Sequence, residues 1–147
     1  MDDGRSVFAQ QGYDLDRQIG FVLRKAYQRH SYIFADLIEE DITATQFSIM
    51  FRLVEHDGPV SQNALGRMVA MDAATTKGVI VRLLQRGLVS MQKDKVDRRR
   101  YQIDITEEGR ALIMRALPQM KRVTQATLEP LSADEAEDLL RLLIKLT

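Results

Sequence analysis

The sequence contains no cysteine, only three prolines and no long hydrophobic run among its 147 residues. The absence of cysteine excludes disulfides, thiolate metal sites and a thiol-based oxidation switch. No apolar stretch approaches the length needed to span a bilayer, and the first residues lack the basic and apolar regions of a secretory signal. These absences favour a cytoplasmic protein that has no membrane partner.

Patterns for metal binding and catalysis are also missing. The chain has two histidines, His30 and His56, but no His/Asp/Glu cluster with metal-ligand spacing and no HExxH sequence. A nucleophilic Ser61 or Ser90 would need a histidine partner and a GxSxG turn, and the chain has no such turn. We therefore expect no metal, no cofactor and no enzyme activity.

The charge of the chain balances overall but not locally. Lysine and arginine together number 21, as do aspartate and glutamate. Residues 77–100, however, carry eight basic side chains and two acidic ones, a net charge of +6. The local field of such a segment steers a polyanion such as DNA, whatever the total charge. A solvated surface is the alternative interpretation of a charged run taken alone.

Apolar side chains recur at helical spacing near both ends of the chain. Residues 15–40 are expected to form one long helix, whose apolar stripe is wider than a single core face requires. Another helix is expected over residues 107–128, kinked or interrupted at Pro118. A capping box at Ser132 opens the last helix, 133–146, which has little polar surface. The excess apolar surface predicts burial against a second subunit.

The middle of the chain carries the signals of three successive helices. Thr43 and Gln46 have capping-box spacing at the start of the first helix. Ser61 caps the second, which is short, and Asp72 caps the third. The third helix, expected over residues 73–86, ends at Gly87, a position where a left-handed glycine commonly terminates a helix. This order has helix-turn-helix spacing.

Two short strands, 88–93 and 101–105, follow the third helix and flank a basic tip. A helix-turn-helix followed by such a hairpin is a winged helix. The sequence therefore predicts one domain over residues 1–147, mostly α with an α+β winged helix-turn-helix. Its expected parts are a DNA-binding region, 43–106, and terminal helices, 15–40 and 107–147, that form a dimerisation region.

The start of the helix 73–86 is small and polar, which lets it lie deep in the major groove of DNA. Thr75 is interpreted as a capping partner of Asp72. Thr76 and Lys77 are expected to contact DNA, through a methyl group and an ammonium respectively. The candidate contacts on this helix are Ala73, Ala74, Thr75, Thr76, Lys77 and Arg82.

The hairpin tip is expected to contact the DNA backbone and the minor groove. Because strand side chains alternate, Arg99 shares its side with Asp97, which can orient it by a salt bridge. Arg99 is therefore the candidate for insertion into the minor groove, whose negative potential attracts arginine. The other tip residues are expected to meet phosphate or solvent. The candidate contacts of the hairpin are Lys95, Asp97, Arg98, Arg99 and Arg100.

Five short motifs follow one another along the chain: Ile42-Thr43-x-x-Gln46-Phe47, Leu83-x-x-x-Gly87-Leu88-Val89, Asp97-Arg98-Arg99, Ile105-Thr106-Glu107-Glu108-Gly109 and Leu131-Ser132-x-x-Glu135. Together they give nearly the whole chain a resemblance to the MarR family of bacterial and archaeal transcriptional regulators. The resemblance implies a homodimer that binds double-stranded DNA at a pseudo-palindromic operator. Many members release DNA when a small aromatic carboxylate or phenolic compound binds.

One position departs from the resembled family. Members often carry Thr and Arg in the middle of the reading helix, where this chain has Lys77 and Gly78. A glycine inside a helix costs about 0.5–1 kcal/mol relative to alanine. Drift or close packing against a neighbouring helix accounts for such a glycine, and so does a close approach to DNA.

A candidate effector site begins on the first helix. Arg24, Tyr27 and His30 follow at i, i+3 and i+6, and they offer a cation, a hydroxyl and an imidazole to an aromatic carboxylate. Effector pockets of the resembled family commonly lie between the dimerisation helices and the winged region, which adds Phe47 and Met50 to the candidates. The alternative is that Arg24 and His30 are ordinary polar residues, and that a methionine at helical spacing is core.

The predicted function is a dimeric DNA-binding repressor that a small aromatic acid releases from its operator. One alternative is a winged-helix DNA-binding protein without a small-molecule effector. Another is a protein-interaction module, which the basic hairpin argues against.

Overall fold

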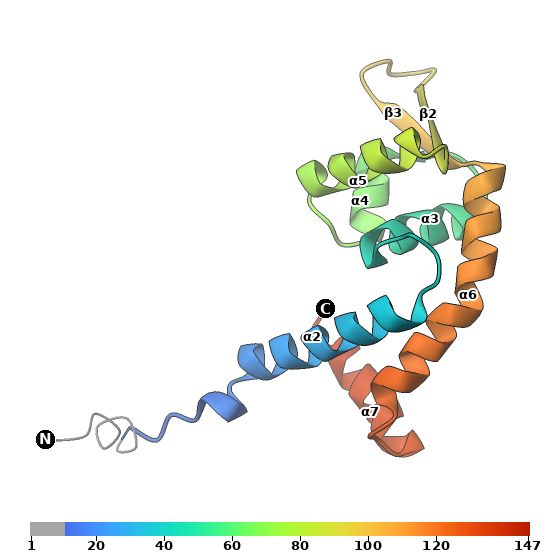
Figure 1. Cartoon of the computed structure of the whole chain (residues 1–147). Helices are drawn as coiled ribbons and strands as arrows, with labels where there is room; N and C mark the ends of the chain where they lie inside the picture. The colour runs from blue at the N-terminus through green and yellow to red at the C-terminus, as the bar shows by residue number, and fades with distance from the viewer. Residues whose placement is uncertain (1–10) are drawn as a thin grey trace, which may run out of the picture. The chain divides into compact units, whose positions relative to one another are not determined.

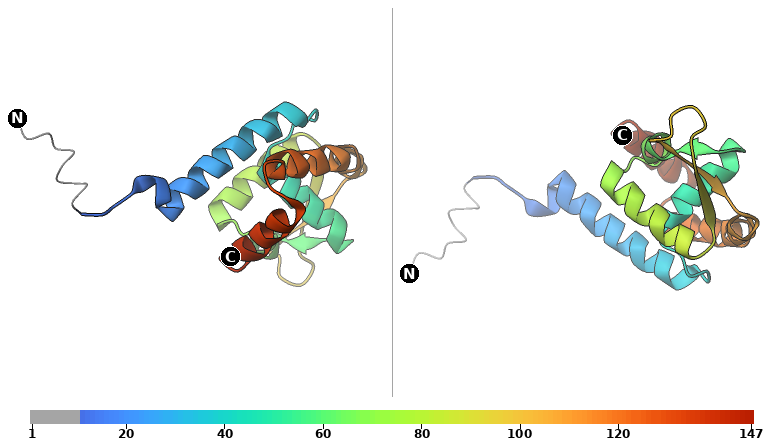
Figure 2. Two further views of the ribbon diagram at one scale, coloured as in Figure 1. Left: turned by 90° about the horizontal axis from the view of Figure 1, so that it is seen from below. Right: turned by 90° about the horizontal axis from the view of Figure 1, so that it is seen from above.

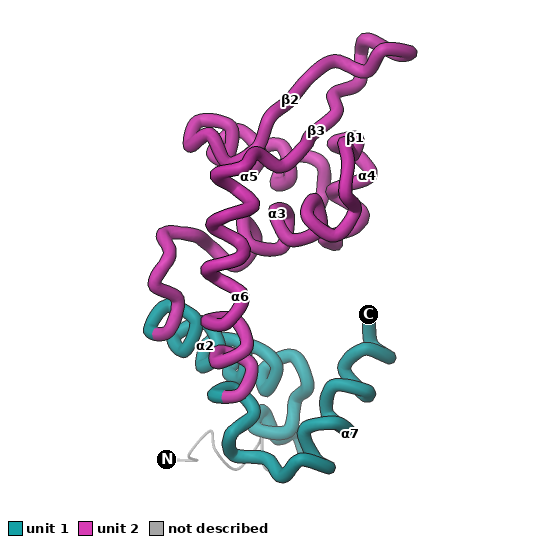
Figure 3. Tube along the Cα trace, turned by 90° about the vertical axis from the view of Figure 1, so that its right-hand side faces the viewer, with its two compact units in different colours: residues 1–36, 126–147 teal, residues 37–125 magenta. Residues whose placement is uncertain are grey.

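The computed structural model describes residues 11–147, which form two compact units (Figures 1 and 3). Residues 37–125 make up the winged unit, shown in magenta in Figure 3. Residues 11–36 and 126–147 make up the terminal unit, shown in teal. The winged unit thus extends past residue 106 and includes most of the helix that follows the hairpin.

The winged unit is a helix-turn-helix followed by a β-hairpin, which confirms the predicted fold class. Its sheet has three antiparallel strands in the order β1-β3-β2. The strand β1 was not predicted; it has only two residues and pairs Val60 with Ile103 and Ser61 with Gln102. The elements are α3 (Ala44–His56), β1 (Val60–Ser61), α4 (Gln62–Met68), α5 (Ala73–Gln85), β2 (Val89–Lys93), β3 (Tyr101–Ile105) and α6 (Glu107–Leu128).

Side-chain caps set the helix boundaries where the sequence predicts them. In the capping box of α3, the Gln46 amide N–H donates to Thr43 Oγ1 (3.2 Å) and the Thr43 amide N–H donates to Gln46 Oε1 (3.0 Å). Ser61 and Asp72 accept from backbone amides at the starts of α4 and α5. Gly87 ends α5 with a φ of 69°, a left-handed conformation that favours glycine.

The hydrophobic core lies inside the winged unit and holds α5 and the hairpin on one rigid frame. The views of Figures 1 and 2 show the hairpin beside α5, with α3 and α4 packed beneath them. Buried aliphatic side chains from all of these elements and from α6 form one cluster. Its members are Ile42, Ile49, Met50, Leu53, Val60, Leu65, Val79, Ile80, Leu83, Leu88, Val89, Ile103, Leu112, Ile113 and Ala116.

The base of the hairpin is tied to the start of α6. Thr106 Oγ1 donates to the Gly87 carbonyl (2.7 Å) and accepts from the Gly109 amide N–H (3.1 Å). Gly109 is buried against the Leu88 carbonyl, and a Cβ at this position would collide with that oxygen. Glycine is therefore required for α6 to approach the hairpin this closely.

Two expectations about the long helices need correction. The predicted helix 15–40 is divided into a 3-10 helix, η1 (Leu15–Arg17), and α2 (Ile19–Leu37). Gln18 between them is extended, and its side-chain oxygen accepts from the Phe21 amide at the start of α2. Pro118 lies inside α6, which runs without a break from residue 107 to residue 128, so the expected interruption is wrong and the expected kink stays a prediction. The N–H that proline lacks would otherwise reach the carbonyl of Met114, on a turn that is exposed to solvent.

The terminal unit is formed by η1, α2, the end of α6 and α7 (Ala133–Ile144). The guanidinium of Arg29 donates to the carbonyls of Thr127 (2.7 Å) and Ala126 (3.1 Å), where a cation is favourable at the end of α6. The predicted capping box of Ser132 and Glu135 is present at the start of α7. Neither α2 nor α7 buries a single residue in the described chain.

Over residues 11–147, no helix combines the length and apolarity that a bilayer span requires.

Candidate nucleic-acid interface

The first turn of α5 presents small and polar side chains to solvent. Ala73, Ala74, Thr75 and Lys77 are all exposed. The carboxylate of Asp72 accepts from the Thr75 amide N–H (2.8 Å) and from the Thr75 hydroxyl (2.9 Å). These hydrogen bonds hold the pKa of Asp72 below its usual value, because they favour the ionised form. The interpretation of Thr75 as a capping partner is confirmed.

Thr76 does not have the place expected for a DNA contact. Its side chain is completely buried, and its hydroxyl donates to the Asp72 carbonyl (2.8 Å). Gly66 of α4 packs on it so closely that a Cβ there would lie 2.9 Å from Thr76 Oγ1. Thr76 therefore fixes the approach of α4 to α5, and the expectation that it contacts DNA is corrected.

Packing within the described chain does not explain why residue 78 is a glycine. Gly78 is exposed in the middle of α5, and apart from its neighbours along the chain and the backbone of its own helix, no atom lies within 4 Å of the position that a Cβ would take. Its φ is not in the left-handed region. Close packing against a neighbouring helix, one of the explanations drawn from the sequence, is absent here.

The tip of the hairpin is a turn held by Asp94, a residue that the sequence analysis did not single out. The Asp94 amide N–H donates to the Arg100 carbonyl (2.9 Å) and closes the loop. The Asp94 carboxylate accepts from the Val96 amide (2.7 Å) and from Gln102 Nε2 (2.9 Å). These bonds lower the pKa of Asp94, the Val96 amide most of all. Aspartate commonly forms turns by accepting from the backbone amide two residues on, and its presence at position 94 could have indicated this turn.

Asp97 orients two arginines at this tip. One carboxylate oxygen accepts from Arg99 Nε (3.2 Å), and the other lies 3.6 Å from Arg100 Nε. The predicted pairing of Asp97 with Arg99 is therefore present. Its cause differs from the predicted one, because residues 97–100 form a turn and strand alternation does not apply. The Arg99 side chain remains 92% exposed and is free to meet a ligand.

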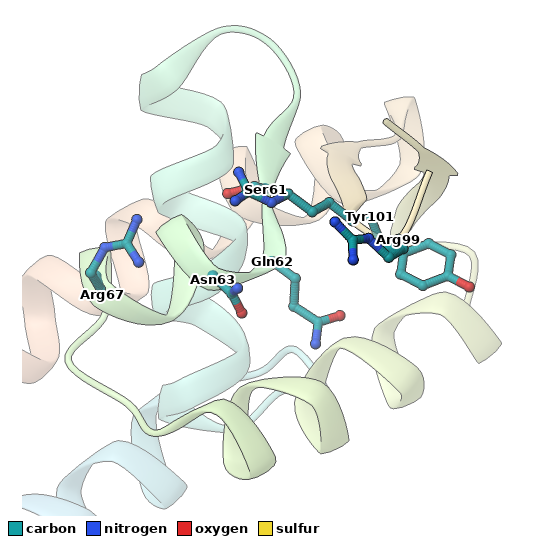
Figure 4. A pocket seen from close by; sticks show the side chains of 7 residues that line it. Ser61, Gln62, Asn63, Arg67, Arg99 and Tyr101 are labelled. Carbon is teal, nitrogen blue, oxygen red and sulfur yellow. The ribbon is translucent and has the colours of Figure 1, made fainter. Parts of the chain in front are cut away.

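The hairpin of β2 and β3, residues 89–105, is the wing of the winged helix. A polar hollow of about 230 Å³ lies between this wing and α4 (Figure 4). Its lining residues on α4 and the tyrosine of β3 were not among the residues predicted from the sequence. Asn63 and Arg67 are four residues apart on a predicted helix, and this spacing could have indicated that they share one face. The lining residues are Ser61, Gln62, Asn63, Arg67, Arg99, Arg100 and Tyr101.

The candidate effector residues are divided between the two units. In the terminal unit, Arg24 lies over the ring of Phe21, with its Cζ 5.5 Å from the ring centroid. Tyr27 and His30 have ring centroids 6.0 Å apart, and His30 Nδ1 lies 2.9 Å from Thr127 Oγ1. The polar partner of His30, Thr127 of the same unit, fits the interpretation of an ordinary polar residue, while Tyr27 is 66% exposed.

Phe47 and Met50 have different environments in the winged unit. Met50 is completely buried in the core, so its expected place at an effector surface is corrected. Phe47 stacks on Phe51, with ring centroids 5.7 Å apart and planes 13° from parallel. The two rings line an apolar groove of about 420 Å³ between α3 and α6. Its other lining residues are Leu117, Met120, Lys121, Thr124 and Gln125.

In the described part of the chain, no group of three or more His, Cys, Asp or Glu side chains is arranged to hold a metal ion.

Comparison with known proteins gives consistent matches over most of the chain. The model of the MarR family matches residues 42–101, from the residue before the α3 cap to the first residue of β3. The transcriptional repressor NicR of Pseudomonas putida is 38% identical over 135 residues, which cover 91% of this chain and 85% of NicR.

Two solved structures are similar in both fold and sequence. One is a probable transcriptional regulator from Pseudomonas aeruginosa, with 44% identity and a TM-score of 0.87 over 91% of this chain and 100% of that chain. The other is BpsR of Bordetella bronchiseptica, with 36% identity and a TM-score of 0.86 over 91% and 96% of the two chains. The DNA binding of BpsR is described as regulated by 6-hydroxynicotinic acid.

Proposed function

This chain belongs to the MarR family of transcriptional regulators, and we propose that it acts as a homodimeric repressor that a small aromatic acid releases from a pseudo-palindromic operator. The observation that carries the proposal is that α5 and the basic hairpin, the wing, are packed on the same hydrophobic core. The exposed start of α5 and the exposed Arg99 stand on the same rigid unit. A reading helix in the major groove and a wing arginine in the adjacent minor groove need such a fixed spacing.

The uncovered helices α2 and α7 support a dimer. Large apolar side chains on them remain between 38% and 69% exposed, although they would be costly to leave in water. A symmetric partner would cover the same surface on both subunits. It would also repeat the reading helix about 34 Å away, one turn along the duplex. The residues concerned are Ile19, Val22, Leu23, Tyr27, Tyr32, Leu139, Leu140, Leu142 and Ile144.

The groove of Phe47 and Phe51 suits a flat aromatic ligand. Its volume falls within the range of small-molecule sites, and stacked phenyl rings favour an aromatic ring. Lys121 at the same groove supplies a cation for a carboxylate. The likeness to BpsR favours a hydroxylated heteroaromatic carboxylate as effector. Arg24, Tyr27 and His30 on α2 stay a prediction for carboxylate recognition.

The effector proposal is tested with 6-hydroxynicotinic acid as the probe. An operator is first selected from random DNA, and the probe is then expected to release the protein from it in a mobility-shift titration. At 100 times its dissociation constant, the probe should add about 2.7 kcal/mol to the free energy of unfolding, seen as a higher melting temperature.

Two charge-removing variants then locate the carboxylate. Lys121→Ala should abolish the thermal shift if the groove is the site, whereas Arg24→Ala should abolish it if the row on α2 is the site. A protein that binds the operator but ignores this and related aromatic acids would support the alternative, a winged-helix protein without an effector.

Gly78→Ala tests the reading helix with two effects of opposite sign. Alanine should raise the free energy of unfolding by about 0.5–1 kcal/mol, because the site is helical and open. The same methyl should weaken operator binding, since it enters the space between α5 and the groove floor. Thermal denaturation and fluorescence anisotropy measure the two effects. Greater stability with unchanged affinity would leave drift as the explanation of this glycine.

A further inference from the structure

A network of hydrogen bonds connects β3 to the tip of the wing, residues 94–100. Gln102 Nε2 donates to one carboxylate oxygen of Asp94, Oδ2 (2.9 Å). The other oxygen, Oδ1, accepts from the amides of Val96 (2.7 Å) and Asp97 (3.3 Å). Asp97 Oδ1 in turn accepts from the Arg99 amide (3.1 Å) and from Arg99 Nε (3.2 Å). The conformation of the tip is therefore linked to a side chain that lies outside it.

Gln102 is the fixed end of this network. It lies on β3, the central strand of the sheet, where it pairs with Ser61 of β1 and with Gln92 of β2. The next residue, Ile103, is completely buried in the hydrophobic core. Because strand side chains alternate, the side chain of Gln102 points away from that core. The core thus holds the backbone of Gln102 in place and leaves its amide free to bond the tip.

The tip has no apolar packing of its own. Val96 is the only apolar residue among residues 94–100, and it is 97% exposed. Two further hydrogen bonds close the tip, from the Asp94 amide to the Arg100 carbonyl (2.9 Å) and from the Arg100 amide to the Asp97 carbonyl (3.0 Å). Polar contacts rather than burial therefore set its conformation. Loss of one contact lets the tip take other conformations, and DNA binding must then order it at a cost in affinity.

We infer that Gln102 is a positioning residue for operator binding, which acts through Asp94 to hold the wing tip in the conformation that presents Arg99 to DNA. The inference rests on the proposed function and assigns to it a residue outside both the reading helix and the wing tip. Asp94 is not a DNA contact itself, because its carboxylate repels phosphate. Gln102 carries no charge, and its amide is occupied by Asp94. Its effect on DNA binding therefore passes through the arginines of the tip.

Gln102→Leu tests this role without changing the charge of the protein. Leucine cannot donate to Asp94, so operator affinity should fall by roughly 3- to 10-fold. The slope of log affinity against log salt should stay at the wild-type value, because no phosphate contact is lost. Wild-type affinity for this variant, or a shallower salt slope, would overturn the inference.

Gln92→Leu is the matched control for this measurement. Gln92 lies opposite Gln102 on β2, but its side chain takes no part in the network of Asp94. The control variant should bind the operator with the affinity and salt slope of the wild type. The melting temperatures of both variants show whether the winged unit remains folded.

A reversed hydrogen bond separates positioning from direct contact with DNA. The double variant Asp94→Asn/Gln102→Glu has the net charge of the wild type and of Gln102→Leu. Its asparagine oxygen still accepts from the Val96 amide, while its NH₂ group donates to the new glutamate. The double variant should therefore bind within about twofold of the wild type. An affinity as low as that of Gln102→Leu would overturn the inference.

Arg99 provides a second readout. In an Arg99→Ala background, Gln102→Leu should cost less affinity than it does in the wild type, because the two changes act on the same contact. In the wild-type background it should relax the base preference that Arg99 supplies. Equal losses of affinity in both backgrounds would overturn the inference and leave the proposed function intact. A wild type that binds no DNA at all would instead overturn the proposed function, and the inference with it.

Discussion

Leu140→Asp is expected to convert the protein from a dimer to a monomer. Leu140 is 46% exposed on α7, where it lines a shallow apolar hollow with Ala136 and Ile144. Burying a leucine stabilises by about 1.5–3 kcal/mol, and a symmetric interface contains it twice. The dimer dissociation constant should therefore rise roughly 10²- to 10⁴-fold, and further if the carboxylate stays buried. Sedimentation equilibrium measures the change.

Operator affinity should fall with the loss of the dimer, because a monomer reaches one half-site only. The variant should nevertheless remain folded, since no residue of α7 belongs to the core of the winged unit. Asp138→Ala is the matched control on the same helix. It removes an exposed ion pair with Arg141 (3.3 Å), which contributes little to stability. A Leu140→Asp protein that stays dimeric would exclude α7 from the interface.

Arg99→Ala is expected to weaken operator binding by roughly 1–3 kcal/mol, or about 5- to 150-fold. The physical reason is the loss of a guanidinium that Asp97 holds at the hairpin tip while leaving it exposed. An arginine in a narrow minor groove senses base sequence through groove width. Selection from random DNA should therefore show a relaxed preference at the outer positions of the site, and anisotropy titration gives the affinity.

Arg98→Ala provides the contrast at the same tip. Arg98 is exposed and, within residues 11–147, forms no ion pair, so it should contact phosphate. Its removal should lower affinity on all sequences equally and reduce the salt slope. Identical sequence preferences for the Arg99 variant and the wild type would remove Arg99 from the minor groove.

Local chemistry is what made much of the fold predictable. Thr43 with Gln46, Asp72 with Thr75, and Gly87 each act within a few residues, so their signals are complete in the sequence. The strand β1 was missed because two residues carry no periodicity and pair with β3 about 40 positions away in the chain. The break in the helix at Gln18 was not predicted. There the side-chain oxygen of Gln18 accepts from the Phe21 amide, and glutamine is not a residue whose presence usually indicates a helix start.

Residues of the candidate site were predicted correctly where their contacts lie close in sequence. They were predicted wrongly, or not at all, where another element of the fold decides whether they are exposed. Asp97 and Arg99 are close in sequence, and their pairing follows from that proximity. Thr76 looks like its neighbour Thr75 in sequence, but Gly66 of another helix decides that it is buried. Arg67 becomes part of the site only because β3 brings the wing arginines beside α4.

The contacts of Thr106 and Gly109 with the hairpin base connect any movement of α6 to the position of the hairpin. The same helix carries Lys121 at the aromatic groove, 12 residues after Gly109 and thus about 18 Å along the helix at 1.5 Å per residue. A tilt of roughly 5° at the groove displaces the wing base by about 1.5 Å over that arm. Because a Cβ at Gly109 would collide with the Leu88 carbonyl, the base of the hairpin is in close contact with α6. We therefore expect a molecule that fits the groove to change the position of the wing without touching DNA.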